Sequence, residues 1–66
     1  MHPKELLLRP LRWKKVELGR WETVVDDRRC SLVMNDFPDE PLYTLTVDGR
    51  SLDFDDQPKH WTIDFT

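Results

Sequence analysis

The sequence predicts a small all-β protein, an antiparallel meander of five or six strands that forms a small barrel or a strongly twisted sheet. Apolar and polar residues alternate along most of the chain, which is the period of half-buried strands. Turn-forming pairs such as Asp48-Gly49 separate the alternating runs. Seven aromatic residues supply large rings for a core. At 66 residues there is room for a single small domain, residues 1–66.

The opening segment favours one short helix or helical turn, with an edge strand as the alternative. Pro3 suits the first turn of a helix, and Glu5–Arg9 contains good helix formers. The next run, Trp13–Leu18, is the weakest strand candidate. Gly19-Arg20 predicts the tight turn that follows it.

The middle of the chain predicts two strands joined by a tight turn. Trp21–Val25 alternates except at Val24, and Asp26–Arg28 is a turn signal. Cys30–Met34 is apolar at both alternating sets of positions, which is typical of a central strand covered on each face.

The second half predicts three more strands and two loops. Tyr43–Val47 and Leu52–Phe54 flank the Asp48-Gly49 hairpin signal, and Trp61–Phe65 alternates cleanly. Asn35–Pro41 and Asp55–His60 contain prolines, which cannot donate to a sheet ladder. We therefore expect these two segments to be the long loops of the domain.

Charge is distributed unevenly along the chain. Residues 1–29 hold eight basic and five acidic residues, whereas residues 30–66 hold two basic and eight acidic ones, so the halves carry +3 and −6. This asymmetry predicts opposite-signed faces if the halves occupy separate strands. It predicts no such faces if the halves interleave in the sheet.

The cysteine count and hydropathy favour a soluble, cytoplasmic protein. Cys30 is the single thiol, so no internal disulfide forms, and a reducing compartment is the default expectation. No run approaches the roughly 18 apolar residues of a membrane span. The first residues lack the pattern of a secretory signal.

One run of acidic, aromatic and proline residues spans the second half of the chain. Asn35–Leu45 reads NDFPDEPLYTL, Val47–Gly49 follows, and Asp53–Trp61 reads DFDDQPKHW. This arrangement resembles that of small bacterial proteins made of one such domain. The resemblance implies no activity, ligand or catalytic residue.

The residue types present argue against an enzyme. Nucleophilic catalysis needs a thiol or hydroxyl beside a histidine, and the only histidines are His2 and His60. Cys30 lies in an apolar run, where a free thiol packs as a small hydrophobe. Both glycines are isolated turn residues, so no phosphate-binding loop is predicted, and we expect no cofactor.

Two acidic clusters are the candidate ligand sites. Asp36, Asp39 and Glu40 form one cluster, and Asp53, Asp55 and Asp56 form the other. If the two proline loops meet at one end of the sheet, six acids converge, and hard cations such as Ca²⁺ take six to eight oxygen ligands. The spacing matches no EF-hand loop, so we expect solvated turn acids that guard the strand edges and no metal site.

These features favour a non-enzymatic protein-binding module, an adaptor or an inhibitor of the immunity-protein kind. Aromatic anchors surrounded by charge are typical of protein interfaces. Trp61, Phe37 and Tyr43 flank the loops, and Phe37 is the best candidate for an exposed anchor. The expected partner is another protein, possibly a basic one, and no membrane is expected to take part. The expected binding residues are Asp36, Phe37, Asp39, Glu40, Asp55 and Asp56.

Two alternatives use other parts of the chain. Arg12, Trp13, Lys14 and Lys15 combine positive charge with an aromatic ring, as in single-stranded nucleic-acid-binding barrels. The pI of about 5.2 opposes this alternative. The second alternative is a structural subunit that self-associates through an exposed sheet edge.

Overall fold

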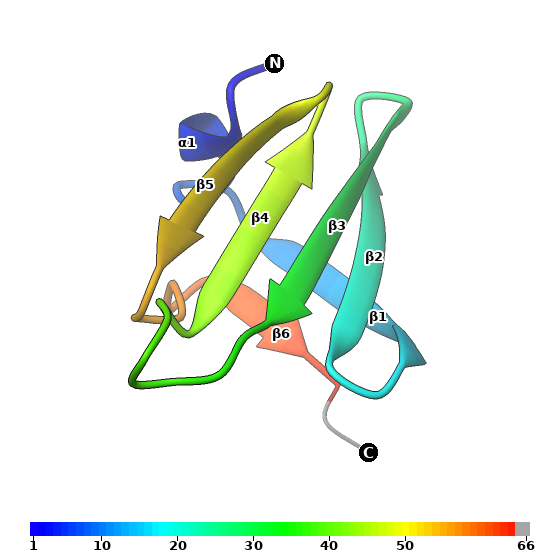
Figure 1. Ribbon diagram of the computed structural model, residues 1–66. Helices are drawn as coiled ribbons and strands as arrows, with labels where there is room; N and C mark the ends of the chain where they lie inside the picture. Colours follow the sequence, from blue (N-terminus) through cyan, green and yellow to red (C-terminus); the bar gives the residue numbers. More distant parts are fainter. Residues whose placement is uncertain (65–66) are drawn as a thin grey trace.

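The computed structural model describes residues 1–64 and confirms the all-β class (Figure 1). A helical turn, α1 (Pro3–Leu6), precedes six strands. The strands are β1 (Leu11–Glu17), β2 (Arg20–Val25), β3 (Arg28–Met34), β4 (Tyr43–Val47), β5 (Arg50–Phe54) and β6 (Trp61–Ile63). They form one sheet in the order β5-β4-β3-β2-β1-β6. The predicted last strand continues into residue 65, which lies outside the described residues.

The first five strands form the predicted antiparallel meander, but the sixth strand does not continue it. β6 pairs with β1 in parallel, through Leu11–Trp13, while the rest of β1 pairs with β2. The connection after β5 therefore crosses to the opposite edge of the sheet. The predicted antiparallel meander is thus confirmed for five strands, and β6 makes the sheet mixed, because a long loop allows a strand to pair with a partner distant in sequence.

The sheet curls into a half-barrel. The rings of Phe54 on β5 and Trp61 on β6 lie 5.5 Å apart, although their strands occupy opposite edges of the sheet. Trp61 also meets Trp13 edge-on at 5.1 Å. Aromatic contacts therefore bring the two edges together across the core, and no strand ladder joins β5 to β6 among the described residues.

The tight turns are confirmed. Asp26, Asp27 and Asp48 have φ of 51°, 64° and 53°, and Gly49 has φ of 73°. Two consecutive residues in the left-handed region match the right-handed twist of a hairpin, and Asp and Gly tolerate that region best. The β2–β3 and β4–β5 turns lie at the same end of the half-barrel as α1, which we call the hairpin end (Figure 1). The β1–β2 turn lies at the opposite end.

The concave face of the sheet holds the core. Alternate strand residues point inward, and Trp13, Cys30, Leu32 and Leu45 are almost completely buried. The convex face is open to solvent. The expectation that β3 is covered on both faces was wrong, since Ser31 and Val33 are only half-buried.

Candidate functional site

The two proline-containing loops lie at the same end of the sheet, opposite the hairpin end. The first loop joins the end of β3 to the start of β4, and the second loop begins at the end of β5. These three strand ends are neighbours in the sheet (Figure 1). The backbone N–H of Leu42 in the first loop donates to Oδ1 of Asp55 in the second, at 3.0 Å. This hydrogen bond joins the two loops. We call residues 35–42 and 55–60 the acidic loop end.

Asn35 holds the first loop in shape. Its side-chain amide donates to Oγ1 of Thr44 at 2.7 Å and to the carbonyl of Pro41 at 3.0 Å. Its backbone N–H donates to the carbonyl of Leu42 at 2.8 Å. Thr44 in turn donates to Oδ1 of Asp53. The loop ends are thus tied to β4 and β5, which orders the segment between them.

The predicted binding residues lie at the same end of the sheet and face solvent. Phe37 is 59% exposed at the first loop. All five carboxylates of the acidic loop end are exposed, those of Asp36, Asp39, Glu40, Asp55 and Asp56. Tyr43 and Trp61, the other aromatic residues that flank the loops, are each 4% exposed and belong to the core. Phe37 is therefore the aromatic anchor available at this end.

The ion pairs among residues 1–64 lie at two places outside the acidic loop end. Beside the β1–β2 turn, Arg20 pairs with Glu17 at 3.6 Å and with Glu22 at 3.9 Å. At the hairpin end Asp26 pairs with Arg9 at 2.9 Å, and Asp48 pairs with Arg28 at 2.6 Å and with the N-terminal amine at 2.8 Å. The hydrogen bond and charge of Arg9 lower the pKa of Asp26. Within residues 1–64, no carboxylate of the acidic loop end makes an ion pair within 4.0 Å. The five carboxylates of that end therefore have no ion-pair partner, and with the one lysine of the same residues, Lys59, the end keeps an excess of negative charge.

The Asp48 contacts predict a stability that depends on pH. Its hydrogen bond with the N-terminal amine and the charge of Arg28 hold its pKa below the ordinary value of 3.8. A carboxylate whose pKa is lower in the folded state stabilises the fold above its unfolded pKa and loses this effect as the pH falls through the folded pKa. We expect Asp48→Asn to lower the urea midpoint at neutral pH, and the deficit to shrink below about pH 4. A deficit that is constant down to about pH 2 would contradict this assignment.

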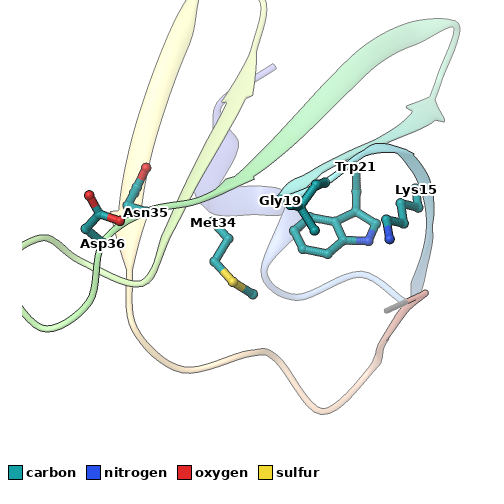
Figure 2. A pocket seen from close by; sticks show the side chains of 7 residues that line it. Lys15, Gly19, Trp21, Met34, Asn35 and Asp36 are labelled. Carbon is teal, nitrogen blue, oxygen red and sulfur yellow. The ribbon is translucent and has the colours of Figure 1, made fainter. Parts of the chain in front are cut away.

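A pocket of about 280 Å³ adjoins the acidic loop end. Figure 2 shows Trp21 and Met34 at its wall, Lys15 beside Trp21, and Asn35 and Asp36 on the loop side. The backbone N–H of Met34 donates to the carbonyl of Gly19 at 2.9 Å, which fixes the β1–β2 hairpin against β3. The pocket extends the exposed apolar surface of this end beyond Phe37.

The basic segment does not form one surface. Strand alternation places Arg12 and Lys14 on the convex face, whereas Trp13 is 1% exposed and lies in the core. Lys15 is half-buried beside the pocket near Trp21. The expectation that Trp13 offers a stacking platform was wrong, because a strand sends successive side chains to opposite faces.

The remaining candidates for chemistry lie apart. Cys30 is buried opposite Val47 near the hairpin end, while His60 belongs to the acidic loop end. Burial raises the pKa of the Cys30 thiol, which keeps it protonated at neutral pH. Among the described residues, no three His, Cys, Asp or Glu side chains are grouped as metal ligands would be.

These features define a small half-barrel protein with an excess of negative charge at one end. No protein-family model matches the chain, and neither a curated protein nor a solved structure matches it. No helix within residues 1–64 has the length and apolar character needed to cross a membrane.

Proposed function

We propose that this chain is a non-catalytic cytoplasmic module that binds another protein through its acidic loop end. The observation that carries the proposal is the set of five exposed carboxylates without ion-pair partners at the same end as the exposed ring of Phe37. Such a surface supplies an aromatic anchor for binding energy and a charged rim for fast encounter. The charge favours a basic partner surface, as in an inhibitor that covers the site of a basic enzyme.

The loop contacts support this proposal because they hold the surface in one shape before binding. Asn35 fixes the start of the first loop, and the Leu42–Asp55 hydrogen bond joins that loop to the second. An ordered surface loses less conformational entropy on binding than a mobile one. The fold thus resembles a rigid scaffold that presents functional loops.

The test is capture of the partner from the organism that encodes the chain. The tagged protein is expected to retain a stoichiometric protein at ~50 mM salt and to lose much of it at ~300 mM, because charge steering is screened by salt. Replacing Asp36 and Asp39 with asparagine should weaken the complex at least about tenfold and slow its association. Asparagine keeps the size of the side chain and removes only the charge.

The control is a double variant with the same change in charge elsewhere, Glu17→Gln with Asp27→Asn. Both positions are exposed and lie outside the acidic loop end. This control should bind as the unaltered chain does. The proposal would be overturned if the Asp36/Asp39 variant bound the partner as tightly as the control variant does. Release of the partner by nuclease would also overturn it.

A further inference from the structure

A second surface of opposite charge lies on the convex face of β1, β2 and β3. It is a groove of about 420 Å³ between the side chains that point away from the core. In the strand register Lys14 lies opposite Glu22, and Val24 lies opposite Arg29. We call it the basic groove, and its main residues are Arg12, Lys14, Val16, Glu22, Val24 and Arg29.

The basic groove combines exposed apolar side chains with free cations. Val24 is 67% exposed and Val16 is 48% exposed, which is unusual for two valines on one open face. In the described part of the chain, Arg12, Lys14 and Arg29 make no ion pair within 4.0 Å. The one acid, Glu22, is already engaged by Arg20 at 3.9 Å. The groove therefore has a net positive charge around an apolar centre.

We propose that the basic groove binds the acidic loop end of a second copy of this chain. The two surfaces have opposite charges, and each exposes apolar side chains. One presents five carboxylates without ion-pair partners and an exposed phenyl ring at the same end, with Lys59 as its one cation, and the other presents three cations without ion-pair partners and two exposed valines. Docking Phe37 against Val16 and Val24 removes apolar area of both copies from water, while the charged rims set the orientation.

The segregation of charge along the chain makes this contact possible. β1, β2 and the start of β3 come from the basic half of the sequence, and they are neighbours in the sheet, between β4 and β6. The acidic loops come from the other half. The contact is heterologous, because different patches of the two copies meet.

Nucleic acid fits the groove less well than a second copy does. Among residues 1–64 no aromatic side chain lines the groove to stack on a base, and Glu22 places a negative charge in its wall. The net charge of the whole chain is −3, which opposes approach of a polyanion. A protein surface with carboxylates and an apolar ring satisfies the groove better.

The test uses two variants, each of which blocks one side of the contact. The groove variant is Lys14→Glu with Arg29→Glu, and the end variant is Asp36→Lys with Asp39→Lys. By sedimentation in low salt up to ~1 mM, the unaltered chain should increase in mass with concentration. Each variant alone should stay a monomer. An equimolar mixture should form a species of two chains, since the end variant keeps its groove and the groove variant keeps its acidic end.

The control for the groove variant is Lys4→Glu with Arg50→Glu, which makes the same change in net charge at exposed positions outside both surfaces. This control should self-associate as the unaltered chain does. A mixture that stays monomeric, or an unaltered chain that stays monomeric throughout, would overturn the proposal. Binding of a single-stranded oligonucleotide by the unaltered chain, abolished in the groove variant, would also overturn it in favour of nucleic acid.

The experiment separates this proposal from the function proposed above. Both use the acidic loop end, but the groove variant leaves that end unchanged. If the groove variant still captures a partner from the lysate and the mixture stays monomeric, only the self-association fails. If the mixture forms the two-chain species and no partner is captured, only the proposed function fails.

Discussion

Trp61→Ala is expected to remove a large part of the stability of the fold and to lower its urea midpoint strongly. Trp61 is 4% exposed, and its ring contacts Trp13 at 5.1 Å and Phe54 at 5.5 Å. Its indole N–H donates to the carbonyl of Leu6 at 3.0 Å. Removing a buried aromatic side chain costs about 3–5 kcal/mol. A chain of this length has a total stability of only about 3–10 kcal/mol, so one such loss consumes much of it.

Urea unfolding followed by circular dichroism measures this effect without relying on tryptophan fluorescence. Trp61→Phe should lie between the alanine variant and the unaltered chain, because it keeps an aromatic ring and loses the hydrogen bond to Leu6. Thr62→Ala is the control, since Thr62 is the exposed neighbour on the same strand. Equal urea midpoints for Trp61→Ala and Thr62→Ala would show that Trp61 does not hold the two sheet edges together.

The strands could be predicted because their signal is local. Alternation such as that of Tyr43–Val47 depends on one sheet face being buried, and the Asp48-Gly49 turn depends on backbone conformations at two residues. The partner of β6 could not be predicted in this way. Its pairing with β1 depends on contacts across the core, such as that of Trp61 with Trp13, which no local pattern contains.

The residues of the acidic loop end could be predicted from the sequence, but the contacts that join its two loops could not. The clustering of acids near prolines identified Asp36, Asp39 and Asp55 as candidates. Whether the loops meet depends on which strands are neighbours, and this follows from the order of β3, β4 and β5 in the sheet. The role of Asn35 could not be predicted, because its contacts with Thr44 and Pro41 exist only after β4 has paired.

The basic groove was missed for a related reason. The segment 12–15, three basic residues with Trp13 among them, suggested one surface, but a strand divides such a segment between two faces. The cations that do share a face, Lys14 and Arg29, are distant in the sequence and come together through β2. Periodicity could have placed Arg12 and Lys14 together; the strand pairing was needed to add Arg29.

Leu6→Ala should be the second most damaging change to stability, and it tests whether α1 is part of the core. The helix has only four residues, too few to be stable alone. It is held by Pro3 and Leu6, both buried, and by a capping box in which His2 and Glu5 satisfy backbone N–H groups. Leu6 is fully buried, and Leu→Ala at such a site costs about 2–5 kcal/mol.

Leu8→Ala provides a matched control for Leu6→Ala, because it removes the same atoms two residues further along the chain. Leu8 is 82% exposed, so its truncation should change the free energy of unfolding by less than about 0.5 kcal/mol. A large loss at Leu6 alone would mean that α1 closes the hairpin end of the half-barrel against β4 and β5. Equal and small losses at both positions would mean that the six strands form a sufficient core without the helix. Both substitutions change only a side chain, so the backbone carbonyl of Leu6, which accepts a hydrogen bond from Trp61, is present in both variants.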